Sequence, residues 1–444
     1  MQKIRQITKR AGLLAALLVA AGTLAPRAFT QSNVVRVSGT ISSDTTWTAH
    51  NVYVLQGAVF VENAALRIEA GTRIIGESAS NGTLVIARTG QIFAEGRADA
   101  PVVMTSDQPV GSRARADWGG LIINGDAPIN VPGGEAFGEG DTGVYGGTNP
   151  DDSSGVLRYV RVEYAGTEFS PDNELNGIAF QGVGRGTTVE FVQVHFNKDD
   201  GLEFFGGTVD VKYAVCTGIG DDNFDWTEGW QGRGQFWIAQ QYGDDADQGI
   251  EADNNAENND LLPRANPKLF NVTLIGDPEF DLGNESDIGI LLREGTAATI
   301  KNSIVTGFKE TGLDINDPAT FTVAADGGIV LESIIFFRNN PNFSEDGDDD
   351  PAPPFTTRQF AERSPNVVVM DPMLRGPFDQ ISPDYRPTPD SPAVDGRVPF
   401  VLPPNDGFFE PARFIGAMGQ ARDPDPSAPY LGNWVSGWTN FEPN

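Results

Sequence analysis

From residue 157 onward the chain repeats one two-part pattern. The first part is a segment of alternating apolar residues, such as LRYVRVEY (157–164), and the second is a Gly-led segment, such as GIAFQG (177–182). Alternation with a period of two is typical of β-strands, and the Gly, Asn and Asp residues between the segments indicate turns. The first part returns as VEFVQVHF (189–196), VDVKYAVCTG (209–218), GQFWIAQQYG (234–243), KLFNVTLIG (268–276), ATIKNSIVTG (298–307) and GGIVLESIIFF (327–337). The second part returns as GLEFFGG (201–207), NFDWTEG (223–229), GIEADNN (249–255), GILLREG (289–295) and GLDINDP (312–318).

The spacing of these repeats limits the possible folds. Corresponding positions lie about 20 to 33 residues apart, which is the range of solenoid repeats. Two or three short strands in each repeat predict an all-β solenoid, a parallel β-helix, in which every repeat forms one coil. A β-sandwich is the main alternative, but a sandwich does not require matched segments at a regular spacing.

The pattern extends toward the N-terminus and stops near residue 338. LRIEAGTRIIG (66–76) and LVIARTGQIFAEG (84–96) share one frame with an offset of 18 residues, which predicts earlier coils with tighter turns. Residues 126–155 lack periodicity and are predicted to be a long excursion from the stack. We therefore expect a β-helix over residues 29–338 and a loop-rich extension over 339–444, with a short helix at 356–364 and a role as the cap that solenoid ends require.

Aligned second segments indicate which side chains face the core. The second and fourth positions are nearly all apolar and should point inward, so the third position should point outward. The third position reads Ala179, Glu203, Asp225, Glu251, Leu291 and Asp314. Three consecutive coils should therefore place carboxylates on one outer face, about 4.8 Å apart from coil to coil.

The turns before these strands are also acidic, and Asp199–Asp200 lies 22 residues before Asp221–Asp222. Like charges at this spacing repel each other, and a bound cation would relieve the repulsion. Calcium takes six to eight oxygen ligands, so it is the cofactor that this pattern suggests. The candidate ligands are Asp199, Asp200, Glu203, Asp221, Asp222, Asp225, Asp245, Asp247 and Glu251. The alternative is that the turn acids only hydrogen-bond to backbone groups and that the outer acids only form a solvated face.

Composition restricts the location and the partners. Residues 1–28 combine a basic start, an apolar run and small residues near Ala28, which predicts a secretory signal peptide; an uncleaved N-terminal anchor is the alternative. Because residues 1–28 carry five basic and no acidic side chains, their removal takes the net charge of −30 to −35, which argues against nucleic acid as a partner. The sequence contains no second long apolar run that would predict a membrane span. The only cysteine, Cys216, excludes an internal disulfide and is expected in the core.

Several stretches resemble a known group of proteins. The chain resembles secreted right-handed parallel β-helix proteins of the pectin-lyase-like superfamily, and PDYRPTPDSPAVDG (383–396) with RFIGAMG (413–419) resembles an ending common in that group. WGGLIINGDAPIN (118–130) and DDGLEFFGGTVDVKY (199–213) are similar to uncharacterised secreted or surface β-helix proteins of bacteria. The resemblance implies a right-handed β-helix with long loop insertions and an irregular C-terminal cap.

The same superfamily contains polysaccharide hydrolases and lyases. The polygalacturonase pattern of one Asp followed by an Asp-Asp pair about 21–22 residues later is matched by Asp200 and Asp221–Asp222, and Asp225 would lie in the same cleft. Paired carboxylates can act as a general acid and as a base. The His-Gly motif of that family is absent, because the only histidines are His50 and His195. Its Arg-Ile-Lys motif is absent as well, since the arginines that follow the Asp pair are Arg233 and Arg264 and neither begins an Arg-x-Lys.

The main functional expectation is therefore a secreted structural or binding protein, of the surface or adhesion type, that calcium stabilises. Its partners would be an extracellular glycan, another surface protein or further copies of the chain, and it would be extracellular, at the cell surface or in the periplasm. The alternative is a hydrolase or lyase acting on an extracellular polysaccharide, in which Trp226, Trp230, Trp237 and Tyr242 would stack on sugars.

Overall fold

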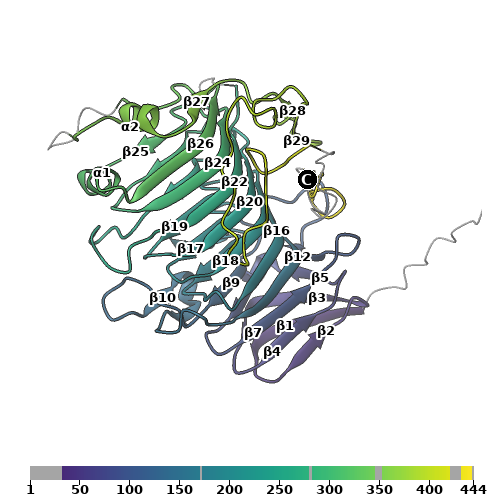
Figure 1. Cartoon of the computed structure of the whole chain (residues 1–444). Coiled ribbons are helices and arrows are strands. Elements are labelled where there is room, and N and C mark those ends of the chain that lie inside the picture. Colours follow the sequence, from purple (N-terminus) through teal and green to yellow (C-terminus); the bar gives the residue numbers. More distant parts are fainter. Residues whose placement is uncertain (1–32, 171–172, 280–282, 346–352, 421–431, 443–444) are drawn as a thin grey trace, which may run out of the picture. The chain divides into compact units, whose positions relative to one another are not determined.

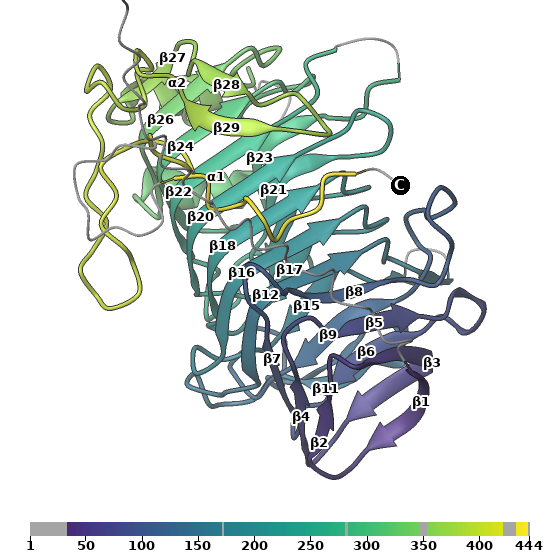
Figure 2. The ribbon, with the colours of Figure 1, turned by 90° about the vertical axis from the view of Figure 1, so that its right-hand side faces the viewer.

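From residue 155 onward, each coil of the structure, a computed structural model, contains one short strand and one long strand that bends in its middle. The structure describes residues 33–170, 173–279, 283–345, 353–420 and 432–442. The predicted signal peptide therefore lies outside the described residues. Strands of successive coils pair in parallel and stack along one axis (Figures 1 and 2). The predicted all-β fold class and the parallel β-helix are confirmed.

The short strands form one parallel sheet. From the N-terminal side its members are the second halves of β1 (Asn33–Ile41) and β3 (Asn51–Val61), then β6 (Thr83–Ile86), β9 (Gly120–Asn124), β15 (Ile178–Gln181), β17 (Leu202–Phe205), β19 (Phe224–Thr227), β21 (Gln248–Ala252), β23 (Ile288–Leu292) and β25 (Asp314–Ile315).

The long strands form two further faces of the coil. They are β12 (Gly155–Glu163), β16 (Thr188–His195), β18 (Asp210–Thr217), β20 (Arg233–Gln240), β22 (Lys268–Ile275), β24 (Ala298–Thr306) and β26 (Ile329–Phe337). Each bends at a residue with positive φ, and these residues are Tyr159, Phe191, Tyr213, Phe236, Asn271, Asn302 and Ser333. The bend leaves a first arm and a second arm that face different sides of the solenoid. In the N-terminal coils β2 (Thr45–Trp47), β4 (Ala65–Ile68) and β7 (Gln91–Glu95) take the place of the first arm. The first halves of β1 and β3, then β5 (Arg73–Gly76) and β8 (Val102–Ser106), take the place of the second arm.

The remaining elements lie outside the coils. They are β10 (Ala136–Gly138), β11 (Gly143–Tyr145), β13 (Glu168–Ser170), β14 (Asn173–Glu174), β27 (Val367–Val369), β28 (Leu374–Gly376), β29 (Asp384–Pro387), the helices α1 (Pro318–Ala325) and α2 (Thr357–Arg363), and two 3-10 turns at Ser78–Ser80 and Glu139–Asp141. Helix α2 confirms the helix predicted at 356–364 and begins at a Thr356–Gln359 capping box. Helix α1 was not predicted, although Asp317 before Pro318 is a typical helix start.

One continuous apolar core fills the solenoid. The second and fourth positions of all six aligned short strands belong to it, as the alternation predicts. Cys216 is fully buried there, as expected for a core residue. Trp226, Trp230 and Trp237 are also fully buried and Tyr242 is nearly so, which removes them as sugar-stacking platforms.

The C-terminal extension does more than the predicted capping. Phe355, Phe360 and Ala361 pack on the end of the core, and β27 pairs with β26. The later residues, 384–420 and 432–442, run back along the side of the stack across the bends of the long strands (Figures 1 and 2). We call these residues the C-terminal strap. The prediction of a simple end cap was therefore incomplete.

Candidate cation site

The outer acids of the short-strand sheet form a straight row, as the alignment predicts. Glu203 pairs in register with Asp225, and Asp225 pairs with Glu251. Their neighbours Leu202, Phe204 and Trp226 point into the core. Parallel pairing without a register shift thus holds three carboxylates on the outer side of three adjacent coils.

This outer face is not solvated, which corrects the expectation of a solvated acidic face. Glu203 and Asp225 are each only 8% exposed. The excursion 126–155 covers the sheet: Tyr145 contacts Phe205 and donates a hydrogen bond to Glu228 over 2.9 Å. The excursion has no repeat of its own, so its position depends on contacts far away in the sequence.

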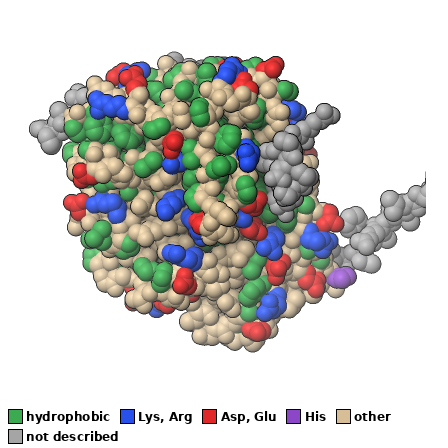
Figure 3. Space-filling view, viewed as in Figure 1, with side chains coloured by type: hydrophobic (Ala, Val, Ile, Leu, Met, Phe, Trp, Pro, Cys, Tyr) green, Lys and Arg blue, Asp and Glu red, His purple; other side chains and the backbone are tan. Residues whose placement is uncertain are grey.

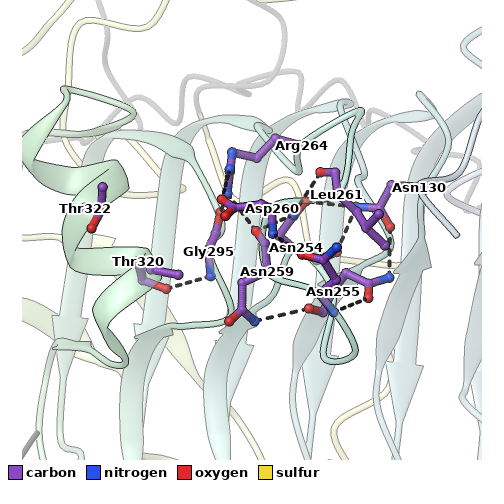
Figure 4. A network of polar contacts seen from close by, with 12 residues as sticks. Asn130, Asn254, Asn255, Asn259, Asp260, Leu261, Arg264, Gly295, Thr320 and Thr322 are labelled. Carbon is purple, nitrogen blue, oxygen red and sulfur yellow. Dashed lines mark hydrogen bonds and ion pairs between the residues drawn. The ribbon is translucent and has the colours of Figure 1, made fainter. Parts of the chain in front are cut away.

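An asparagine network joins the excursion to the insertion at 253–267. Asn130 donates to the side-chain oxygen of Asn254 over 2.9 Å, and Asn255 donates to the oxygen of Asn130 over 3.1 Å. Arg264 in turn reaches Asp260 and the backbone of Gly295 (Figure 4). Figure 4 shows these side chains arranged across several coils, so the network fixes the cover over the acidic row.

The turn acids bind backbone groups of the next coil. The backbone N–H of Asp222 donates to the Asp200 carboxylate over 3.0 Å, and the N–H of Gln248 donates to Asp222 over 2.5 Å. Part of the turn-chemistry alternative therefore applies to these two residues. Each of these bonds uses one of the two carboxylate oxygens.

Seven of the nine candidate ligands come together in three overlapping triads. The ligand atoms within each triad lie within 4.8 Å of one another. The triads are Asp199–Asp200–Asp221, Asp200–Glu203–Asp225 and Asp221–Asp222–Asp247. We call these seven residues the carboxylate cluster.

The other two candidates are neutralised by basic side chains. Asp245 accepts from Lys198 over 3.1 Å, and Glu251 forms an ion pair with Arg293. Among the described residues, no ion pair with Lys, Arg or His involves a member of the carboxylate cluster. Spacing in the sequence could not separate the two groups, because both basic partners come from other coils.

Burial and mutual repulsion raise the pKa of the cluster carboxyls. Burial, followed by the charge of Asp221, raises the pKa of Asp199 to about 8. Burial raises the pKa of Asp247 to about 6, with Asp221 as the next cause. The pKa values of Glu203 and Asp225 lie well above their usual range, again mainly because of burial.

Several polar groups around the cluster were missed from the sequence. Glu139 in the excursion and Glu174 add negative charge, and Asn176 donates a hydrogen bond to Glu203. One carboxylate oxygen of Asp225 and the side-chain oxygens of Asn197 and Asn223 are buried without a hydrogen-bond partner. Asn197 lies two residues before Asp199 and Asn223 directly follows Asp222, and this position beside the two aspartate pairs was the available signal.

Comparison with known proteins identifies the family. The family model of the pectate-lyase like beta helix domain matches residues 39–363. The chain belongs to this family. No curated protein and no solved structure gives a significant match to the chain. Among the described residues, no helix has the length and apolar character to cross a membrane.

Membership of the pectate-lyase like family fits either a protein that acts on polysaccharides or a surface protein. Of the four catalytic candidates, Asp200, Asp222 and Asp225 are buried, whereas Asp221 is partly exposed. A sugar ring cannot contact the three buried carboxylates in this arrangement. Buried carboxylate oxygens and amide oxygens that lack cationic partners are instead the ligand set that calcium prefers.

Proposed function

We propose that the protein is a secreted structural or binding protein of the extracellular space or cell surface, and that a calcium ion bound by the carboxylate cluster stabilises its β-helix. The observation that carries this proposal is the set of three overlapping triads without a basic partner. Uncompensated buried carboxylates are costly, and a divalent cation bound by one of the triads offsets that cost while joining two adjacent coils. The signal-like residues 1–28 and the acidic composition support the location.

We expect calcium to raise the melting temperature well above that measured in EDTA, by several degrees at millimolar calcium, because the ion binds the folded chain only. The measurement is differential scanning calorimetry at neutral pH. Asp225→Asn should remove most of the calcium response, since it removes one ligand from the buried triad. Glu257→Gln, at an exposed position, is the matched control. Equal melting temperatures in calcium and EDTA would reject the cation site.

A second candidate function is hydrolysis of an extracellular polysaccharide, which Asp199 and Asp221 favour. Both are partly exposed, their ligand atoms lie within 4.8 Å, and the pKa of Asp199 is raised to about 8, as a general acid requires.

This second function predicts release of reducing ends from a polysaccharide panel, and a loss of at least about 100-fold for Asp221→Asn. Glu257→Gln should keep full activity. If the wild-type protein releases no reducing ends or unsaturated sugars, the hydrolase and lyase candidates both fail. If it does and Asp221→Asn abolishes the release, the purely structural role fails instead.

A further inference from the structure

The two ends of the solenoid differ in how they are covered. At the C-terminal end, Phe355 and Phe360 pack on the core, and the backbone N–H of Ile315 donates to the side chain of Thr357 over 3.0 Å. Ile315 and Ile334, which face inward on the last coils, are fully buried. At the N-terminal end, within the described part of the chain, β1 pairs only with β3 and β2 only with β4 (Figures 1 and 2).

Inward side chains of β1 are exposed, whereas their partners on the next coil are buried. Val35 pairs in register with Tyr53, and Val37 pairs with Leu55, so each pair faces the same side. Tyr53 and Leu55 are 4% and 0% exposed, but Val35 is 36% exposed and Val37 is half-buried. No described element lies beyond β1 to cover these side chains. The core is therefore open at this end.

The backbone edge of β1 is also open, and its sequence does little to protect it. β1 has nine residues, NVVRVSGTI, of which five are β-branched. Its only charged residue, Arg36, forms an ion pair with Glu77 over 2.9 Å. Natural proteins protect an open edge with several charges, a proline or a very short strand, and β1 has none of these. The edge is therefore suited to pairing with another strand.

The chain that precedes β1 is too short to cover this end in the secreted form. Removal of the predicted signal peptide leaves four residues, 29–32, before Asn33. A coil at this end takes 18 residues, the distance in sequence from Asn33 to its in-register partner Asn51. The cover must therefore come from another molecule.

The charge of the N-terminal end favours a second copy of the chain as that molecule. The whole chain carries a net charge of −30, so two copies repel each other when their acidic surfaces meet. Residues 33–61, which include β1 to β3, carry one basic and one acidic side chain, Arg36 and Asp44, and are neutral overall. Acidic and basic side chains are interspersed over the N-terminal coils, at the lower right of Figure 3. Two copies can thus approach at this end with little repulsion.

Antiparallel pairing of β1 with β1 of a second copy is self-complementary. With a two-fold axis at Ser38, Val35 lies opposite Ile41 of the other copy. Val35 is exposed and Ile41 is half-buried at the edge of the core, so this contact closes both open ends. Arg36 lies opposite Thr40, so no like charges meet. A contact that uses the same surface on both molecules closes after two copies, and the covered C-terminal end prevents growth into a filament.

We infer that the secreted protein forms a two-fold dimer in which the β1 strands of two copies pair antiparallel and join two solenoids end to end. The inference rests on the secreted form proposed above and adds to it a partner, a second copy of the chain.

The test is the mass of the mature secreted chain, measured by sedimentation velocity at micromolar concentration in calcium buffer. We expect twice the mass of one chain. Val35→Lys should raise the dissociation constant at least about 100-fold, because it buries an unpaired charge in the joined core. Val369→Lys is the matched control, since Val369 is exposed on β27 at the opposite end, and it should leave the dimer unchanged.

A cysteine at the two-fold axis tests the register and does not depend on Val35→Lys folding. Ser38 is exposed and lies opposite its own copy, so Ser38→Cys should form a disulfide-linked dimer under oxidising conditions. Thr40→Cys, also exposed, is the control and should not form one, because Thr40 lies opposite residue 36. Cys216, the only native cysteine, is fully buried and should not react.

Three results would overturn the inference: a cleaved chain that is monomeric, a dimer that persists in Val35→Lys, or no disulfide link in Ser38→Cys. Melting temperatures equal to that of the wild type show that a lost dimer does not reflect unfolding. The intact mass of the purified protein identifies its first residue. A chain that retains residues 1–28 contradicts the secreted form itself, whereas a cleaved monomer contradicts only the dimer.

Discussion

In EDTA, the protein should lose thermal stability as the pH rises from about 6.5 to about 9. Burial raises the pKa of Asp199 to about 8 and holds the pKa values of Glu203 and Asp225 well above their usual range, whereas unfolded carboxyls titrate near pH 4. Over this range the folded state therefore binds more protons than the unfolded state. Stability falls with pH wherever the folded state binds more protons, and it is lost as these folded carboxyls ionise.

The expected fall in melting temperature is at least about 5 °C in EDTA, because several neighbouring buried carboxyls contribute. Calcium should flatten the dependence, since the ion replaces the protons that the cluster would otherwise hold. Below about pH 6.5 a second group, His195, affects the pH dependence of stability. Burial lowers the pKa of His195 to about 4. A depressed histidine makes stability fall as the pH drops from about 6.5 to about 4, which is the opposite slope.

Asp225→Asn is the informative variant for this prediction. It removes one charge from the buried triad, so its melting temperature in EDTA should depend less on pH than that of the wild type. Glu257→Gln should follow the wild type at every pH. A melting temperature in EDTA that rises between pH 6.5 and 9 would contradict the assignment of raised pKa values to the cluster.

Much of the fold could be predicted because the core residues of a solenoid recur at fixed positions of a local sequence repeat. The alternation in LEFF and FDWT identifies inward and outward positions without any long-range information. The bend of the long strands also has a local signal in the sequence. Inward residues follow the spacing of Val189, Val192 and Val194, so the period of two is interrupted at Phe191, where φ is positive.

The candidate site was only partly predictable, because its character depends on segments that do not repeat. The sequence placed Glu203 and Asp225 in one row, but the burial of that row depends on the excursion 126–155. The neutralisation of Glu251 depends on Arg293, which lies on a later coil. Local periodicity carries no information about which non-periodic segment folds over which face.

The C-terminal strap packs on a row of stacked aromatic rings at the bends of the long strands. Tyr159, Phe191 and Tyr213 stack along the bends with centroid distances of 4.4 and 4.2 Å. Trp438 contacts Tyr159 and Phe191 edge-on and is 1% exposed, and Trp434 contacts Tyr213 in the same way. The backbone of a bulky residue at positive φ is strained, and Tyr159, Phe191 and Tyr213 all have positive φ. The packing of the strap on their rings must therefore offset this backbone strain.

Trp438→Ala should therefore lower the free energy of unfolding by about 3–5 kcal/mol, as expected for a buried tryptophan. Phe137→Ala, at a ring that is 83% exposed, should change the free energy of unfolding by less than about 0.5 kcal/mol.

Hydrogen exchange distinguishes two ways in which Trp438→Ala could lose this stability. If the strap detaches alone, residues 432–442 lose protection while β16 and β18 keep theirs. Hydrogen bonds from Gln193 and His195 to strap carbonyls join the strap to the stack, so we expect β16 to lose protection as well. An unfolding free energy of Trp438→Ala within about 1 kcal/mol of the wild type would show that the strap contributes little to the stability of the solenoid.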